Sequence, residues 1–201
     1  MKITTEKQLL ELYGQPSERA QKKSMIALDK HAKHFIETSP FIVLASYDKD
    51  GKMDASPRGG VPGFVKVNGA NQILIPDAKG NNRLDTLKNI LKTGSIGALF
   101  LIPGIDETLR LNGTAYLSTD SDLLNLFPEE RIPPKTCIVI TVEEVFLHCA
   151  KAFMRSQLWS EKAKLNRSEF PTMGQMLRDQ IGGNGTLESQ EEMVKRYKQD
   201  F

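Results

Sequence analysis

The chain has 201 residues, and its 27 Lys and Arg nearly balance its 25 Asp and Glu, which leaves a formal net charge of +2 at pH 7. This balance, with only 7% aromatic residues, argues against a basic face for nucleic acid. The length predicts one domain over 1–201, and no stretch is apolar for long enough to span a bilayer. We therefore expect neither a nucleic-acid partner nor a membrane segment.

The cysteines and the opening segment bear on the cellular compartment. Cys137 and Cys149 form neither a disulfide framework nor a C-x-x-C metal pair, and both lie in apolar surroundings. They are therefore expected to be buried, reduced thiols. The opening segment, MKITTEKQLLELYGQ, is polar and lacks the apolar core of a signal peptide. The expected location is the cytoplasm.

Residues 1–39 are predicted to form a helical N-terminal extension. Its longest helix is expected to run through 26–36 until Pro40 ends it. His31 and His34 lie three residues apart in that helix, a spacing that can hold a metal ion. Because the sequence offers no third ligand nearby, we interpret both as surface residues and expect no metal site.

From Phe41 the apolar pattern changes to that of strands. Three or four short strands are expected between 41 and 76, with turns at 48–51 and 68–71 that are short enough to require antiparallel pairing. Three longer strands are expected between 95 and 149. The first of these is nearly uninterrupted in apolar residues and should lie deep in the sheet.

One helix interrupts this run of strands. An apolar strand at 72–76 leads into a polar loop, and an amphipathic helix is expected to open at Arg83. About six antiparallel strands with one inserted helix predict a mainly β (α+β) fold, a six-stranded split barrel over 40–160 with flanking helices. Residues 161–201 are expected to form a helical C-terminal tail.

Three clusters could carry chemistry. The loop 77–83 could bind an anion with the free N–H groups of the following helix, or could be a simple turn. Segment 56–60 ends a strand in a cation flanked by glycines, which either let a ligand approach the backbone or only form a turn. Segment 148–159 places Lys151, Arg155 and Trp159 four residues apart, on one face of a ligand-binding helix or of an ordinary amphipathic helix.

Taken together, the clusters supply cations, amides and an aromatic ring, which suits a phosphorylated planar heterocycle. Other site types lack their motifs. The sequence contains neither G-x-G-x-x-G after its first strand nor G-x-x-x-x-G-K-[ST] anywhere, and it contains neither G-x-S-x-G nor H-E-x-x-H. Nucleotide sites of the Rossmann and P-loop type, and common hydrolase sites, are therefore disfavoured.

Five ordered segments carry a family resemblance: DASPRGG (54–60), IPDAKGNNRLDTLKNIL (75–91), FLIPG (100–104), ETLRLNG (107–113) and HCAKAFMRSQLW (148–159). With these segments the chain resembles the pyridoxamine 5′-phosphate oxidase-like FMN-binding split-barrel family, in a branch of uncharacterised flavoproteins. The resemblance implies a homodimer with two FMN sites at the subunit interface. This sequence lacks the Arg-x-His pair with which the oxidase binds pyridoxal phosphate, so the resemblance does not predict the substrate.

The resemblance also implies roles for individual residues, all in FMN binding. The phosphate would be held by Arg58, Asn82 and Arg83, with Lys66 and Lys79 as weaker candidates. Pro76 and Asp77 would lie along the isoalloxazine, and Ser56 and Thr108 would approach its polar edge. Lys151, Arg155 and Trp159 would reach the flavin bound mainly by the partner subunit.

The function expected from this resemblance is that of an FMN-dependent oxidoreductase. Hydride transfer would pass through flavin N5, with a small-molecule substrate or an electron donor such as NAD(P)H. Two alternatives stay open: a flavin-binding or carrier protein without turnover, and a barrel of the same family that uses F420 or haem. No side chain is assigned a catalytic role.

Overall fold

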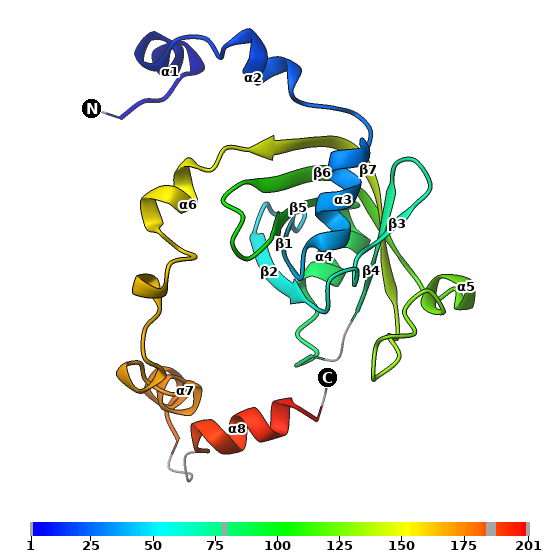
Figure 1. The fold of residues 1–201 in the computed structure, drawn as a ribbon, viewed down its shortest axis with the longest axis vertical. Coiled ribbons are helices and arrows are strands. Elements are labelled where there is room, and N and C mark those ends of the chain that lie inside the picture. Colours follow the sequence, from blue (N-terminus) through cyan, green and yellow to red (C-terminus); the bar gives the residue numbers. More distant parts are fainter. Residues whose placement is uncertain (1, 78–79, 184–187, 200–201) are drawn as a thin grey trace.

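The computed structural model describes residues 2–77, 80–183 and 188–199. Its centre is one antiparallel sheet that curls into a split barrel, with the strand order β2-β1-β5-β6-β7-β4-β3 (Figure 1). The strands are β1 (Phe41–Tyr47), β2 (Met53–Gly59), β3 (Lys66–Asn68), β4 (Gln72–Pro76), β5 (Ser95–Leu101), β6 (Thr108–Ser118) and β7 (Cys137–His148).

The sheet has seven strands, so the predicted number of six was wrong. The difference comes from the segment before the second glycine turn, which forms the three-residue strand β3 and pairs with β4 through Val67 and Ile73. So short a strand adds one hairpin to the edge of the sheet and leaves the predicted architecture unchanged. The mainly antiparallel split barrel with flanking helices is confirmed.

Helices flank the sheet and continue beyond it at both ends of the chain. They are α1 (Glu6–Tyr13), α2 (Glu18–Lys22), α3 (Lys30–Thr38), α4 (Asp85–Thr93), α5 (Ser121–Leu124), α6 (Lys151–Ser156), α7 (Met173–Ile181) and α8 (Gln190–Tyr197). Two short 3₁₀ turns, Glu161–Ala163 and Arg167–Glu169, lie between α6 and α7. No helix of the described ranges is long and apolar enough to cross a membrane.

The core lies between the concave face of the sheet and two helices. Helix α3 buries Ala32 and Ile36, and α4 buries Leu87 and Ile90 against the same apolar cluster, in which Phe100 of β5 is fully buried. Burying side chains of this size stabilises the fold by about 1.5–3 kcal/mol each. The position of α4 is therefore set by the core, and the loop before it is held in place.

Strand β6 bends at a bulge. The register between β6 and β7 shifts between Asn112 and Gly113. A Cβ atom on Gly113 would lie 2.0 Å from the carbonyl oxygen of Thr141, so only glycine fits. Such bulges increase the local twist of a strand, which helps a sheet to curl.

Two predicted helices begin later than expected. Met25 exchanges backbone hydrogen bonds with Val145, so the chain is extended there, and α3 begins only at Lys30. Asp29 caps α3 by accepting the N–H of Ala32 at 2.7 Å. Helix α4 begins at Asp85 instead of Arg83, because Leu84 has a left-handed backbone conformation with φ of 60°.

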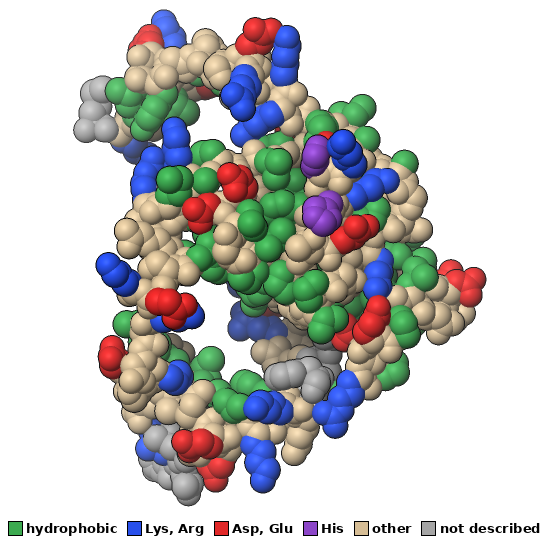
Figure 2. Space-filling model, viewed as in Figure 1, with side chains coloured by type: hydrophobic (Ala, Val, Ile, Leu, Met, Phe, Trp, Pro, Cys, Tyr) green, Lys and Arg blue, Asp and Glu red, His purple; other side chains and the backbone are tan. Residues whose placement is uncertain are grey.

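The segments at both ends of the chain extend beyond the barrel. We call residues 2–24 the N-terminal arm and residues 150–183 and 188–199 the C-terminal arm. Figure 1 shows the C-terminal arm leaving the sheet at α6 and turning back beneath the barrel at α8, where Arg131 donates a hydrogen bond to the carbonyl oxygen of Lys198 at 3.2 Å. The N-terminal arm contacts β7 where Lys23 donates to the carbonyl oxygen of Leu147 at 3.0 Å. Figure 2 shows open space between the barrel and other parts of the arms. The arms expose large apolar side chains, among them Tyr13, Leu165 and Ile181.

Candidate functional site

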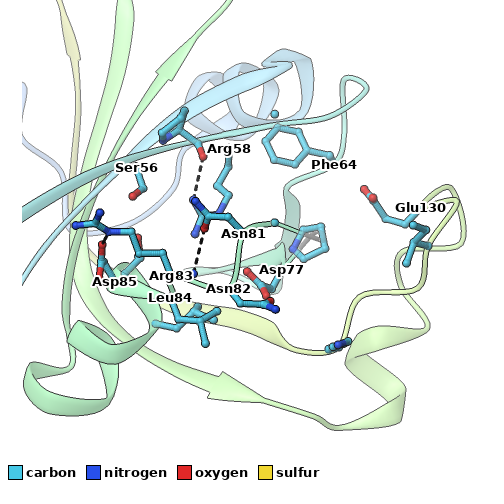
Figure 3. A pocket seen from close by; sticks show the side chains of 18 of the residues that line it. Ser56, Arg58, Phe64, Asp77, Asn81, Asn82, Arg83, Leu84, Asp85 and Glu130 are labelled. Atoms are coloured by element: carbon cyan, nitrogen blue, oxygen red, sulfur yellow. Dashed lines mark hydrogen bonds and ion pairs between the residues drawn. The ribbon is translucent and has the colours of Figure 1, made fainter. Parts of the chain in front are cut away.

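A cavity of about 510 Å³ opens between strand β2, the loop that links β4 to α4, and the loop before β7 (Figure 3). This volume is within the range of small-molecule and cofactor sites. Apolar side chains, including Phe64, Leu87 and Ile132, share its wall with cationic, acidic and amide groups. The mixture suits a ligand with both a flat apolar part and a charged part.

Six of the predicted cofactor-binding residues line this cavity: Ser56, Arg58, Pro76, Asp77, Asn82 and Arg83. They come from three separate stretches of sequence. Strand β2 contributes the first two, the end of β4 the next two, and the loop before α4 the last two. The structure thus brings together two of the three sequence clusters.

The loop before α4 has an unusual backbone. Asn82 and Leu84 both have positive φ, at 59° and 60°, which is rare for residues other than glycine. The side-chain oxygen of Asn81 accepts the N–H of Arg83 at 3.1 Å and supports this conformation. Such strained loops are concentrated at functional sites.

The N-terminus of α4 faces the cavity without a capping side chain. Leu84 occupies the N-cap position and makes no side-chain cap hydrogen bond. The N–H groups of the first helical turn, from Asp85 to Leu87, therefore lack the partner that a capping residue would supply, and the helix dipole adds positive potential at the same place. Together they form a site for an anion.

Two arginines lie beside this helix end. Arg58 donates a hydrogen bond to the carbonyl oxygen of Pro57 at 2.9 Å. Arg83 is exposed and forms an ion pair with Asp85; this hydrogen-bonded pair raises the pKa of Arg83 and lowers that of Asp85. Both guanidinium groups lie at the cavity, where an anionic ligand can reach them (Figure 3).

Asp77 is half-buried in the cavity wall. Burial raises the pKa of its carboxyl, and the positive charges of Arg58 and Lys135 act against that rise. The backbone N–H of Asp77 donates to the carbonyl oxygen of Thr136 at 2.9 Å, which places the loop before β7 beside the end of β4. Lys135 thereby becomes a cavity residue, one that the sequence did not indicate.

A hydrogen-bonded network supports the cavity where β2 lies beside α4. The carboxylate of Asp54 accepts hydrogen bonds from Ser56 (2.9 Å), Thr86 (2.6 Å) and Ser46 (3.3 Å). Asn89 donates to Ser46 at 3.0 Å. The network joins β1, β2 and α4 and holds two cavity residues, Ser56 and Thr86. Asp54 was present in a sequence motif but had no predicted role.

Glycines near Arg58 were expected to let a ligand approach the backbone. For Gly60 the structure gives another reason: a Cβ atom there would lie 2.7 Å from Cβ of Phe64. Phe64 is buried and lines the cavity. Gly60 therefore makes room for an aromatic wall residue.

Two predicted lysines do not contribute to the described cavity. Lys66 lies at the start of β3 and forms an ion pair with Glu129 at 2.8 Å, and it is not among the described residues that line the cavity. Lys79 lies outside the described residues.

The remaining four predicted residues lie at another end of the barrel. Thr108 is buried opposite His148, where β6 pairs with β7, and Lys151 and Arg155 are exposed on α6. None of these, nor Trp159, is among the described residues of the cavity in the same chain. The structure of one chain therefore does not unite the third sequence cluster with the other two.

The spacing predicted that Trp159 shares a helical face with Lys151 and Arg155, and this prediction was wrong. Helix α6 ends at Ser156 because Gln157 has a positive φ of 50°. Beyond this end, Trp159 donates its indole N–H to the carbonyl oxygen of Ile105 at 3.0 Å and stacks on Phe153. The tryptophan thus fastens the start of the C-terminal arm to the loop before β6.

The donor set of the cavity fits a phosphorylated heterocycle better than a metal or haem. The described residues contain no cluster of three His, Cys, Asp or Glu that could hold a metal ion. The described part of the cavity wall contains no His, Cys, Met or Tyr, the usual axial ligands of haem iron. Two arginines and an uncapped helix N-terminus instead favour a phosphate.

The sequence matches the family model described as pyridoxamine 5′-phosphate oxidase over residues 28–149. Among functionally curated proteins, no sequence matches the chain significantly. Two crystal structures of HupZ from Group A Streptococcus are similar in fold. One, of a variant, has 20% identity and a TM-score of 0.51 and covers 62% of this chain and 100% of its own. The other has 18% identity and a TM-score of 0.50 and covers 60% and 93%.

A more distant structure, an FMN-binding protein from Syntrophomonas wolfei, has 14% identity and a TM-score of 0.45 and covers 71% of this chain and 93% of its own. The family match covers both β2 and the start of α4, and hence the two walls that hold Arg58 and Arg83. Both arms lie outside it.

Proposed function

The chain belongs to the pyridoxamine 5′-phosphate oxidase family, and we propose that it is a flavoprotein that binds FMN in the cavity between β2 and α4. The observation that carries this proposal is the uncapped N-terminus of α4, which faces the cavity between Arg58 and Arg83. Backbone N–H groups and guanidinium groups are the donors that a phosphate requires. The flat ring would lie against the apolar wall near Phe64 and Pro76.

We further propose that the protein is an FMN-dependent oxidoreductase. Bound FMN would supply hydride transfer at its N5 atom. The protein's own residues would bind and orient the cofactor: Arg58 and Arg83 hold its phosphate, and Pro76 shields its ring from water. Arg58 and Lys135 add positive charge near Asp77, which favours negative charge on a bound ligand. NAD(P)H is the candidate electron donor, and the substrate would be a small molecule.

We propose that the protein acts as a homodimer, and its surface area supports this. A compact monomer of 22.5 kDa exposes about 9,500 Å². The chain exposes 13,886 Å², roughly 4,400 Å² more. Interface areas count both partners, so burying only half of this excess on each of two chains would already give about 4,400 Å² in total, which is in the range of obligate homodimers. The arms expose Leu165 and Ile181, and the outer face of β1 and β2 exposes Tyr47 and Met53, so apolar surface is available on both sides of such a contact.

The dimer would also explain why Lys151 and Arg155 lie far from the cavity residues of their own chain. Lys151 and Arg155 are exposed on the first helix of the C-terminal arm and are not among the described residues that line the cavity of their own chain. In a dimer they would reach the flavin of the partner subunit. A cytoplasmic location is part of the same proposal, in keeping with two free cysteines. Cys137 is buried as predicted, whereas the prediction that Cys149 is buried was wrong, because Cys149 lies exposed just after the end of β7.

Titration of the full-length protein with FMN and, in parallel, with riboflavin tests the binding proposal. We expect FMN to bind more tightly, since riboflavin lacks the phosphate that α4, Arg58 and Arg83 would hold. Equal affinities would show that the protein makes no favourable contact with the phosphate. If neither flavin binds, the proposal is refuted.

A separate experiment distinguishes an oxidoreductase from a flavin carrier. The FMN-loaded protein is mixed with NADPH or NADH without oxygen, and bleaching of the flavin absorbance is followed in time. Bleaching faster than that of free FMN supports an enzyme. A bound flavin that resists both nucleotides, and also a panel of other reductants, supports the carrier. Replacing FMN with F420 in the titration tests the remaining cofactor alternative.

A further inference from the structure

Asp54 lies on the same face of β2 as Ser56 and Arg58, next to the cavity, and its hydrogen bonds determine how a cavity hydroxyl is presented. The carboxylate oxygen Oδ1 accepts from Ser56, and Oδ2 accepts from Thr86 and from Ser46. Two of these three residues line the cavity, Ser56 from β2 and Thr86 from the first turn of α4, and Figure 3 shows the Ser56 hydroxyl turned toward α4. Ser46 is buried and is not among the described cavity residues.

This arrangement leaves the Ser56 hydroxyl able to act only as a hydrogen-bond acceptor toward a ligand. A serine hydroxyl has one hydrogen and two lone pairs, whereas a carboxylate has only acceptors. The hydrogen of Ser56 is therefore used on Asp54, and the oxygen offers only lone pairs to a ligand. The backbone N–H groups at the start of α4 and the guanidinium groups of Arg58 and Arg83, in contrast, offer only donors. The Ser56 hydroxyl thus supplies an acceptor beside these donors.

We propose that Asp54 is a positioning residue that makes Ser56 an obligate acceptor for a hydrogen-bond donor on the bound cofactor. This inference rests on the proposed binding of FMN. Flavins carry two kinds of donor, the hydroxyl groups of the ribityl chain and the imide N–H of the ring. The phosphate dianion and the ring carbonyl groups have no proton to donate. Ser56 is therefore expected to bind the ribityl chain or the ring imide of the cofactor and not its phosphate.

The test compares three variants with the wild-type protein: Ser56→Ala, Asp54→Asn and the double variant. In Asp54→Asn the amide oxygen can keep Thr86, which makes the shorter bond, and the amide N–H₂ then donates to Ser56 and turns its hydrogen toward the ligand. Ser46→Ala is the matched control, because it removes a serine hydroxyl from the same carboxylate without touching the cavity. Affinities for FMN and for riboflavin are measured together with thermal stability.

We expect Ser56→Ala and Asp54→Asn each to weaken both flavins by roughly three- to tenfold, the value of one hydrogen bond. In the double variant, the Asp54 change should add nothing to the loss caused by Ser56→Ala, since Asp54 acts through that hydroxyl. Ser46→Ala should lower stability and leave both affinities unchanged. Riboflavin matters here because removing the Asp54 charge could itself change the affinity for the anionic FMN.

The inference is overturned if Ser56→Ala leaves the affinities unchanged, if the two losses add, or if Ser46→Ala weakens binding as much. A wild-type protein that binds neither flavin would instead refute the proposed function. N3-methylriboflavin identifies the donor. If the Ser56→Ala loss disappears with this analogue, Ser56 accepts from the imide, and if the loss persists, Ser56 accepts from the ribityl chain; each result supports the inference.

Discussion

The hydroxyl of Thr86 donates a hydrogen bond to Oδ2 of Asp54 at 2.6 Å and so ties the first turn of α4 to strand β2. Thr86 is 1% exposed, which makes this one of the few polar contacts inside the core. Asp54 lies on β2 and Thr86 on α4, so their bond links the strand that carries Arg58 to the helix that follows Arg83.

Replacing Thr86 with Val should destabilise the protein. The substitution keeps the shape of the side chain and removes a donor to a carboxylate, which we expect to lower the free energy of unfolding by about 2 kcal/mol. Urea denaturation measures this. Thr38→Val is the control, because Thr38 only bonds back to the carbonyl oxygen of His34 on its own helix; there we expect a change within about 0.5 kcal/mol. Equal effects would show that the Thr86–Asp54 bond is not special.

Replacing Arg83 with Ala should weaken FMN binding and spare the fold. Arg83 is exposed, so its loss should change the free energy of unfolding by less than about 0.5 kcal/mol. Loss of a charge-assisted phosphate contact should reduce the affinity for FMN roughly 10- to 100-fold. Arg196→Ala is matched to it, since Arg196 is likewise an exposed arginine paired with a carboxylate, that of Glu188. If Arg83→Ala protein copurifies with a full complement of flavin, the phosphate lies elsewhere.

His148 should make the protein less stable in mild acid. Burial, followed by the charges of Arg110 and Lys23, lowers the pKa of His148 from 6.5. The unfolded chain therefore takes up this proton at a higher pH than the folded protein does. No effect is expected well above pH 6.5, and the free energy of unfolding should decrease as the pH falls below it. His148→Gln should show a smaller decrease between pH 7.5 and 5.5 in urea unfolding; an equal or larger decrease would contradict the assignment.

The C-terminal arm should hold two subunits together. Leu177 on α7 is an exposed apolar side chain, and an aspartate there would place a charge in the proposed contact. We expect Leu177→Asp to convert the dimer to monomers in sedimentation experiments at micromolar concentration. Gln180→Asp adds the same charge to the same helix at an exposed polar position and should leave the dimer intact. A wild-type protein that sediments as a monomer would refute the dimer itself.

The parts of this structure that could be predicted are those that depend on local sequence. Strand β1 begins and ends where its apolar pattern does. The two segments that contain Arg58 and Arg83 could be predicted as candidate binding segments, because the end of a strand and the start of a helix have local sequence signals. The short strand β3 was harder to count, since three residues give little pattern.

The parts that could not be predicted depend on contacts between distant residues. Lys135 enters the cavity only because Asp77 bonds to Thr136 across the pairing of β4 with β7. Helix α3 begins later than predicted because Met25 pairs with Val145, 120 residues further along the chain. The role of Asp54 likewise depends on Thr86, which reaches it from another element. None of these pairings leaves a periodic signal in one sequence.

The most direct test of the account is the flavin content of the full-length protein. The protein is incubated with excess FMN and desalted, and its visible absorbance is recorded, with Arg83→Ala and Arg196→Ala treated in parallel. We predict about one tightly held flavin per chain in the wild type and in Arg196→Ala, and much less in Arg83→Ala. A wild-type protein that emerges colourless, or an Arg83→Ala protein as yellow as the wild type, would contradict FMN binding at the start of α4.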